Sequence, residues 1–327
     1  MDVMNPSPTS LAVGFRDFGS PDVLEVVEVP LLDPRPAEVR VSVRAAAANP
    51  TDTLTRSGAN RARLEGAEPP FVVGMDIAGV VEAVGEGVDA WQVGDEVAGI
   101  TVPGKLAGKG GYCQRVVLPA ESLTRIPRGS TFVEASTLPM NGLTAVNALD
   151  VLDLPPGSTI VVTGGAGAFG GYTIPLARRR GLHVIADGAP ADEELLLRLG
   201  ADIVVERGPG VAQRIVEAAG RRVDGVIDGA VIGDELMDAL ADGAPFLVVR
   251  SLADATSVRG IDVRRVLVVD YARRTDLLDE LRALVEDGTL ELRVAQTFAP
   301  EDAPEIHRRL EAGGVRGRMV IDWSHLA

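Results

Sequence analysis

The segment that decides the organisation of this chain is Val161-Val162-Thr163-Gly164-Gly165-Ala166-Gly167-Ala168-Phe169-Gly170. An apolar run leads into a glycine-rich turn, and a helical pattern follows. Gly165, Gly167 and Gly170 have the G-x-G-x-x-G spacing of a dinucleotide fingerprint, which combines a tight turn, close approach of backbone to a pyrophosphate, and close packing of helix on strand. The first N–H groups of such a helix, at the positive end of its dipole, bind phosphate. We therefore expect cofactor contacts from Gly165, Ala166, Gly167, Ala168, Phe169 and Gly170.

The spacing alone also fits an ordinary glycine turn, so the flanking sequence decides between the two interpretations. Ser158–Val162 precedes the turn as a strand, Leu176–Arg179 continues it as a helix, and His183–Ala186 supplies a second strand. Beyond them, apolar strands alternate with helices. Strands are predicted at Ile203–Val205, Gly225–Asp228 and Phe246–Val249, and helices at Asp192–Leu199 and Val211–Glu217. This alternation implies a doubly wound parallel sheet of the Rossmann type.

The rest of the chain has a different period. Leu24–Pro30 and Glu38–Arg44 alternate apolar and polar side chains, as half-buried strands do. Further strands are predicted at Val80–Val84, Asp95–Gly99, Leu290–Val294 and Arg318–Asp322, and a surface helix at Ala303–Leu310. The sequence thus predicts an α/β protein in which a dinucleotide-binding domain, residues 129–264, is inserted into a β-rich domain made of residues 1–128 and 265–327. The cleft between two such domains is a common place for a ligand site.

Composition narrows the class of protein. The formal net charge of −15 argues against nucleic acid or an anionic membrane as a partner, because both require clustered Lys and Arg. Cys113 is the single cysteine, so an internal disulfide and a thiolate-rich zinc site are not expected. The first residues lack the basic and apolar regions of a signal peptide, and no apolar run approaches the roughly 18 residues of a membrane helix. The sequence therefore predicts a cytoplasmic protein.

Several motifs in order carry a family resemblance. They are Asn49-Pro50-Thr51-Asp52, Val73–Val81, Val93–Val97, Gly110–Cys113, Leu138–Ala145 and Val315–Val320. From about Leu11 onward the chain resembles the medium-chain dehydrogenase/reductase superfamily, and within it the zinc-independent quinone oxidoreductase branch. The resemblance implies a GroES-like substrate domain around a Rossmann domain, and NAD(P)H as the cofactor. It further implies hydride transfer to a quinone or an α,β-unsaturated carbonyl, and a homodimer.

Departures from the zinc-dependent relatives exclude a metal. Those relatives carry Cys where this chain has Asn49, and a His-Glu pair where it has Met75-Asp76. Their four-cysteine lobe is also missing. Without these ligands there is no Lewis acid to polarise a carbonyl or alkoxide, so we expect no zinc.

The resemblance places Asn49, Asp52, Leu54 and Met140 around the substrate. Many relatives carry a tyrosine at the position of Leu54, so no proton donor is assigned here. A quinone oxygen can take its proton from solvent, whereas an enone needs a donor or enolate stabilisation. The missing tyrosine therefore favours quinones slightly.

Each of these positions also has a structural interpretation. Asn49 fits the cap of a turn, and Asp52 fits pairing with Arg56 or capping of the helix. Leu54 and Met140 fit core positions. Tyr112 fits either a packing role or the lining of the cleft.

Cofactor contacts beyond the glycine turn follow partly from the resemblance and partly from charge. The resemblance places Thr144 near the nicotinamide. It also places Arg318 at the same end of the cofactor, and the alternative interpretation is that Arg318 is a surface residue. Asp187 lies about 20 residues beyond the fingerprint, where an acid binds the ribose 2′-hydroxyl of NADH and repels the 2′-phosphate of NADPH. The branch often uses NADPH, but Asp187 is followed by Asp192, Glu193 and Glu194 without a cation. Local charge therefore predicts NADH, provided that Asp187 is not an ordinary solvated turn residue.

Two further features concern assembly and alternative functions. The apolar run Val266–Val269 is predicted to be an edge strand that pairs with its twin in a homodimer, or else a run buried within one chain. His183, His307 and His325 are too scattered for a metal site or a proton relay. Besides a quinone or enone reductase, the sequence allows an enoyl reductase of a biosynthetic pathway. It also allows a dinucleotide-binding sensor without turnover.

Overall fold

A computed structural model describes residues 8–105, 108–249 and 258–324, which form two compact units. The first comprises the described residues of Met1–Met140, Ala272–Glu286 and Leu292–Ala327. The second comprises those of Asn141–Tyr271 and Asp287–Glu291. Residues 1–7 and His325, which entered the sequence predictions, lie outside the described part. Helix α3, Pro139–Leu152, runs from the first unit into the second.

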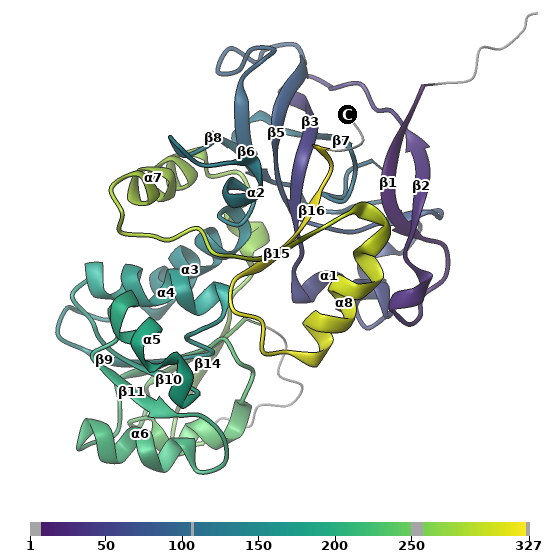
Figure 1. Cartoon of the computed structure of the whole chain (residues 1–327). Coiled ribbons are helices and arrows are strands. Elements are labelled where there is room, and N and C mark those ends of the chain that lie inside the picture. Colours follow the sequence, from purple (N-terminus) through teal and green to yellow (C-terminus); the bar gives the residue numbers. More distant parts are fainter. Residues whose placement is uncertain (1–7, 106–107, 250–257, 325–327) are drawn as a thin grey trace, which may run out of the picture. The chain divides into compact units, whose positions relative to one another are not determined.

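The second unit contains a six-stranded sheet whose strands are all parallel (Figure 1). Its strand order is β11-β10-β9-β12-β13-β14. The strands are β9 Thr159–Thr163, β10 His183–Gly188, β11 Ile203–Glu206, β12 Gly225–Asp228, β13 Pro245–Val248 and β14 Asp262–Arg265. The connecting helices are α4 Ala168–Arg179, α5 Glu193–Leu199 and α6 Val211–Ala219. The predicted doubly wound α/β sheet is confirmed.

The central strand β9 decides where a ligand can bind on this sheet. The chain leaves β9 toward β10 and β11 on one side and returns to β12 on the other. The order of strands therefore reverses between β9 and β12, and ligands of open α/β sheets bind beyond the carboxyl ends of the strands at such a reversal. Apolar residues fill both faces of β9, because Ile160, Val161 and Val162 are fully buried.

The first unit is built mainly from antiparallel strands. One sheet has the order β2-β1-β4, and the other has the order β15-β16-β3-β5-β6-β8, with β7 also paired to β3. The strands are β1 Thr9–Phe15, β2 Glu25–Pro30, β3 Glu38–Ala47, β4 Phe71–Val72, β5 Asp76–Val84, β6 Glu96–Ile100, β7 Arg115–Pro119, β8 Leu123–Arg125, β15 Val294–Phe298 and β16 Arg318–Asp322. The helices are α1 Pro50–Arg56, α2 Phe132–Ala135, α7 Thr275–Glu286 and α8 Ala303–Ala312. The predicted β-rich domain with a returning C-terminal strand is confirmed.

Strand β3 positions the residues of interest in this unit. It pairs with β5, β7 and β16, and Ala47 lies opposite Val320 at its carboxyl end. The chain leaves β3 directly into Asn49 and α1, beside the start of β16 at Arg318. Asp76 begins the neighbouring strand β5. Asn49, Asp76 and Arg318, which are far apart in the sequence, therefore meet at this end of the sheet.

Two strand predictions are wrong. The strand expected at Leu290–Val294 begins at Val294 and runs to Phe298. Residues 287–291 belong to the second unit, and the pairing with β16 starts at Val294, which lies opposite Arg318. The run Val266–Val269 is not a strand either.

The edge strand of the parallel sheet is instead β14, and the last residue of its partner, Val248, lies opposite Arg265. Beyond β14, Val266 N still donates to Val248 O at 3.0 Å, and the chain then forms a short 3-10 helix, Val268–Tyr271. Val266 and Val268 are buried within this chain.

In the described part of the chain, no helix has the length and hydrophobicity needed to cross a membrane.

Candidate active site

The glycine turn has the geometry of a dinucleotide fingerprint. Strand β9 ends at Thr163, and α4 begins at Ala168. Gly164 takes the positive φ of 66° that the turn requires, one residue before the first glycine of the motif. A Cβ on Gly170 would lie 2.6 Å from Gly164 O and from Gly165 Cα, so the helix packs on the turn at a distance that only glycine allows. The first N–H groups of α4 have no carbonyl of the preceding helical turn to bind and are suited to phosphate.

Two buried aspartates brace this turn at the carboxyl ends of its neighbouring strands. Asp187, on β10, accepts a hydrogen bond of 2.6 Å from Gly164 N. Asp228, at the end of β12, accepts one of 2.6 Å from Thr163 Oγ1 and others from the N–H groups of Ile232 and Gly233. Both carboxylates therefore hold backbone at the strand reversal.

Asp187 is not the solvated turn residue that the sequence allowed, because it is only 4% exposed. Burial raises the pKa of Asp187, and hydrogen bonds from the amides of Gly164 and Gly165 oppose that rise. The carboxylate is thus turned into the glycine turn. Thr144, on α3, is buried in the same unit, and Phe169 lies on α4 against Gly229.

In the first unit, Asn49 and Asp52 form the start of α1. Asp52 Oδ2 accepts a hydrogen bond of 2.8 Å from Asn49 N, which is the helix-capping role allowed for Asp52. Asp52 Oδ1 accepts another from Gly74 N at 3.2 Å. The alternative pairing with Arg56 is wrong, because the Arg56 guanidinium binds Glu311 and Gly19 O.

Asp76 gathers three donors at the start of β5. Its Oδ2 accepts hydrogen bonds from Arg318 Nη2 at 2.6 Å and from Asn49 Nδ2 at 3.0 Å, and its Oδ1 accepts one from Met140 N at 2.6 Å. Arg318 is 3% exposed and also binds the carbonyls of Ala48 and Thr137. The alternative of a surface arginine is wrong. Ionised Asp76 needs this partner, because an unpaired buried charge is costly.

The Asn49 side chain has a defined orientation. Its Nδ2 donates to Asp76 Oδ2 and, at 3.4 Å, to Ala47 O, whereas its buried Oδ1 has no hydrogen-bond partner in the described structure. A flipped amide would set Oδ1 against a carboxylate and a carbonyl, so this assignment follows from the hydrogen bonds. Asn49 therefore offers an acceptor, and no donor, to anything that meets its free oxygen.

A second buried chain of polar groups runs from Asp52 through Tyr112 to His307. Tyr112 Oη donates to Asp52 Oδ2 at 3.1 Å and lies 3.3 Å from His307 Nε2. Tyr112 and His307 are fully buried, and Asp52 is 1% exposed. Burial raises the pKa of Asp52 to about 7 and lowers the pKa of His307 to about 3. Neutral His307 then donates from Nε2 to Tyr112, which leaves Nδ1 as the buried atom without a partner.

The sequence analysis missed His307 by assigning it to a surface helix without a relay. Its helix, α8, buries Ala303, Ile306 and His307. These positions follow the i, i+3, i+4 spacing of one helix face, and that spacing was the signal that could have shown the burial. Leu54 and Met140 are half-buried, which leaves both a core and a pocket role open to them.

Comparisons with known proteins cover nearly the whole chain. An alcohol dehydrogenase GroES-like domain matches residues 35–128, and a zinc-binding dehydrogenase domain matches residues 199–321. The quinone oxidoreductase of Pseudomonas aeruginosa is 30% identical over 328 residues, which span 94% of this chain and 98% of that protein. The chain belongs to the quinone oxidoreductase-like branch of the medium-chain dehydrogenase/reductase superfamily.

Other members of this branch are similar over comparable lengths. A 2-haloacrylate reductase of a Burkholderia species is 29% identical, over 95% of this chain and 98% of its own. The structure of the quinone oxidoreductase of Coxiella burnetii superposes with a TM-score of 0.84 at 26% identity, over 96% of this chain and 99% of that one.

Possible metal ligands are few at the positions where the sequence comparison with zinc-dependent members of the superfamily places their zinc ligands. Here those positions hold the Asn49 amide, the Met75 thioether and the Asp76 carboxylate, which is bound to Arg318. In residues 8–105, 108–249 and 258–324, no three His, Cys, Asp or Glu side chains gather in an arrangement that could hold a metal ion. Burial raises the pKa of the Cys113 thiol to about 12.

Proposed function

We propose that this protein is an NAD(P)H-dependent reductase that transfers hydride to a quinone or an α,β-unsaturated carbonyl without zinc. The observation that carries the proposal is the glycine turn between β9 and α4, at the strand reversal of a parallel sheet, in a chain of the quinone oxidoreductase-like branch. The cofactor, when bound, supplies the hydride from its nicotinamide ring.

The residues of the second unit fit the cofactor. The proposed phosphate contacts lie in the turn and the first turn of α4, from Gly165 to Gly170, held in place by Asp187 and Asp228. Gly165 N–H already donates to Asp187 and Gly167 N–H to Gly164 O, so the proposed donors to phosphate are the N–H groups of Ala168, Phe169 and Gly170. Glycine at position 167 leaves room for a pyrophosphate beside the backbone. Thr144 and Arg318 stay proposed contacts for the nicotinamide end. Because Arg318 is held in a buried ion pair with Asp76, a role in positioning is simpler for the Arg318 side chain than direct contact with the cofactor.

In the first unit, Asn49, Asp52, Leu54 and Met140 remain the proposed surroundings of the substrate. None of them supports the donation of a proton to an enolate. Leu54 and Met140 carry no acidic proton, and the free atom of Asn49 is an acceptor. The pKa of Asp52 is raised to about 7, but both of its oxygens are bound to donors of the protein, Asn49 N, Gly74 N and Tyr112 Oη. A quinone places the new charge on oxygen, which takes a proton from water. We therefore favour quinones as the substrate class.

A second substrate class has its own support. The similar 2-haloacrylate reductase is named for a conjugated substrate, in which a carbon–carbon double bond accepts the hydride. An enoyl reductase would use the same cofactor site and require a proton donor at carbon. A sensor that binds the dinucleotide without turnover would need neither.

One assay separates these functions. Oxidation of NADH and of NADPH is followed with p-benzoquinone, phenanthrenequinone and a crotonyl thioester, each with and without a chelator. Chelator-resistant turnover of a quinone supports the proposal, whereas turnover of the thioester alone moves the function to enoyl reduction. Nucleotide binding without any turnover would favour the sensor.

The oligomeric state is also a proposal. We infer a homodimer from the resemblance, with the outer edge of β14 as the candidate contact in place of the run Val266–Val269. In the described residues, β14 pairs on one side only, with β13. A molar mass from light scattering equal to that of one chain would contradict the dimer.

A further inference from the structure

Two buried carboxylates hold Asn49, a proposed contact of the substrate. Asp52 accepts a hydrogen bond of 2.8 Å from the Asn49 backbone N–H, and Asp76 accepts one of 3.0 Å from the side-chain Nδ2. The first bond fixes the start of α1, and the second fixes the rotation of the amide. The position of Asn49 Oδ1, which has no partner in the described structure, therefore depends on both carboxylates.

The charges of the two carboxylates are supported differently. Asp76 has a cation of its own, because Arg318 Nη2 lies 2.6 Å from its Oδ2. Burial raises the pKa of Asp52 to about 7, and the negative charge of Asp76 adds to that rise, whereas Arg318 opposes it. In the described structure, the hydrogen-bond partners of Asp52 are all uncharged donors: Asn49 N, Gly74 N and Tyr112 Oη. The ionised form of Asp52 therefore depends on these hydrogen bonds.

Tyr112 is the one side chain among these donors, and His307 decides where its proton points. A hydroxyl has one proton to donate, and Tyr112 Oη lies 3.1 Å from Asp52 Oδ2 and 3.3 Å from His307 Nε2. Neutral His307 that carries its proton on Nε2 donates to Tyr112 and leaves the hydroxyl proton to Asp52. Hydrogen bonds in such a chain strengthen one another. His307 therefore favours ionised Asp52 through Tyr112.

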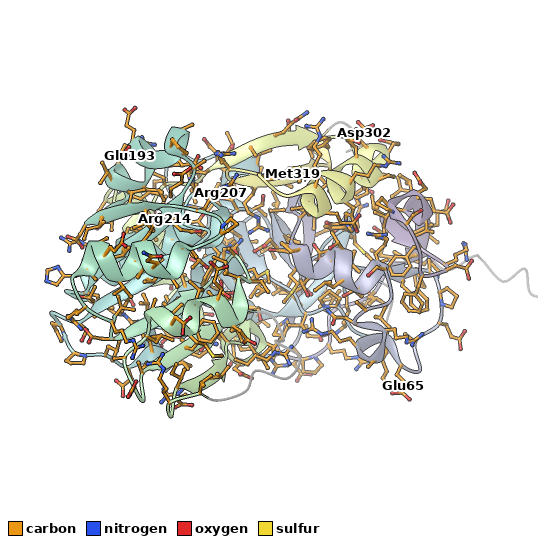
Figure 2. All side chains as sticks on the ribbon, turned by 90° about the horizontal axis from the view of Figure 1, so that it is seen from below. Glu65, Glu193, Arg207, Arg214, Asp302 and Met319 are labelled. Carbon is orange, nitrogen blue, oxygen red and sulfur yellow. The ribbon has the colours of Figure 1, made fainter. Side chains whose placement is uncertain are left out.

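Helix α8 brings His307 to this site. The helix follows Asp302, which Figure 2 labels, and lies beside α1 (Figures 1 and 2). Burial lowers the pKa of His307 to about 3, and the charge of Arg56, on α1, contributes to the decrease. Arg56 is held in place by Glu311 at the end of α8. His307 therefore stays neutral throughout the pH range in which Asp52 changes its charge.

We propose that Tyr112 and His307 are positioning residues of the reductase, which keep Asp52 bound to the start of α1 and thereby hold Asn49 for the substrate. Neither residue needs to touch the substrate or the cofactor, and neither passes a proton to them. The proposal rests on the proposed function, because it takes Asn49 as a contact of the substrate. It gives a role to His307, for which the sequence indicated none.

The positioning role predicts a loss of activity at acid pH. Protonated Asp52 carries a hydrogen of its own, although donors already occupy both of its oxygens, so at least one of these donors must turn away. Reductase activity should therefore decrease as the pH falls through about 7. The hydrogen bond from Tyr112 opposes the rise in the pKa of Asp52 that burial causes, so its removal should move this decrease to higher pH.

The test is the pH dependence of kcat/KM for p-benzoquinone at saturating nucleotide. In Tyr112→Phe, the midpoint of the acid decrease should rise by about one pH unit, with recovery toward the wild-type value at higher pH. His307→Leu should shift the midpoint in the same direction, whereas His307→Gln, which keeps a donor for Tyr112, should restore the wild-type profile. Tyr271→Phe removes an exposed hydroxyl bound to Asp150 and is the matched control, with an unchanged profile.

The outcomes separate the positioning role from the proposed function. An acid decrease that is absent from the wild type, or that lies at the same pH in the wild type, Tyr112→Phe and His307→Leu, would overturn the role and leave the reductase function intact. An equal loss at every pH would also overturn it, since a structural defect alone acts in that way. No turnover of any acceptor by the wild type would overturn both proposals.

Circular dichroism at the assay temperature checks that each variant is folded. The two His307 variants carry the test if Tyr112→Phe does not fold, because they differ only in whether Tyr112 keeps a donor.

Discussion

The Tyr112 hydroxyl donates a hydrogen bond to Asp52 over 3.1 Å, and the two side chains come from segments 60 residues apart. Both are buried, so neither can exchange its partner for water. Tyr112 also contacts His307 on α8, which ties helices α1 and α8 together through three polar groups. Three of the predictions below concern this hydrogen-bonded group and the ion pair of Asp76 with Arg318.

Replacing Tyr112 with phenylalanine removes the shared hydroxyl and leaves Asp52 and His307 each short of a partner. An unsatisfied buried polar group costs about 1–3 kcal/mol. We expect Tyr112→Phe to lower the free energy of unfolding by about that amount, as measured by urea denaturation. Tyr271→Phe is the control, because Tyr271 Oη binds Asp150 at an exposed site, and its loss should be much smaller. Equal losses of stability in the two variants would argue against the buried hydrogen bonds of Tyr112 with Asp52 and His307.

His307 makes the stability depend on pH at the acid side. Burial lowers its folded pKa to about 3, below the ordinary value of 6.5. Its contribution to stability is thus fully present above pH 6.5 and is lost as the pH falls toward 3, because the unfolded chain binds the proton first. The full loss corresponds to roughly 4–5 kcal/mol.

We expect His307→Gln, which keeps a donor for Tyr112, to lose less stability than the wild type between pH 6.5 and pH 4. Urea denaturation over this pH range measures the difference. His183→Gln, which replaces an exposed histidine outside the hydrogen-bonded group of Asp52, Tyr112 and His307, is the matched control. A wild-type slope in His307→Gln would show that His307 is not held neutral.

Arg318 neutralises a carboxylate that is fully buried. We expect Arg318→Met to cost about 3–5 kcal/mol of unfolding free energy, since Asp76 then remains as an uncompensated charge. The double variant Arg318→Met with Asp76→Leu should recover part of this loss. Arg274→Met breaks an exposed ion pair with Asp276 and should cost less than about 1 kcal/mol. A small effect of Arg318→Met would mean that water reaches Asp76.

Two glycines of the fingerprint should separate stability from nucleotide binding. Gly170→Ala forces a Cβ to within 2.6 Å of backbone, so we expect a loss of about 1–3 kcal/mol in unfolding free energy. Gly167 has an ordinary φ of −71°, and a Cβ there would meet a single atom at 3.1 Å. Gly167→Ala should therefore melt close to the wild type and bind NADPH or NADH more weakly. Unchanged binding by Gly167→Ala would contradict the proposed phosphate contact.

The sequence by itself determined the elements whose signals are local. The apolar run, the glycine spacing and the helical pattern from Val161 to Gly170 predict a strand, a turn and a helix, because neighbouring residues decide each of them. The alternating period of Glu38–Arg44 predicts a half-buried strand for the same reason. The order of the motifs identified the family, and the α/β sheet and β-rich domain followed.

Only the tertiary structure decided what the polar side chains of these elements do. Asp187 reads as a free acid in sequence, but the fold turns it onto Gly164, and strand pairing sets Arg207 beside it. In sequence, His307 reads as a surface residue and Arg318 as either a cofactor contact or a surface residue. The structure buries them, on α8 and β16, against Tyr112 and Asp76. A charge acquires its role from partners that lie tens or hundreds of residues away. Periodicity indicates which face of an element is buried, but it does not indicate which residues will pack against that face.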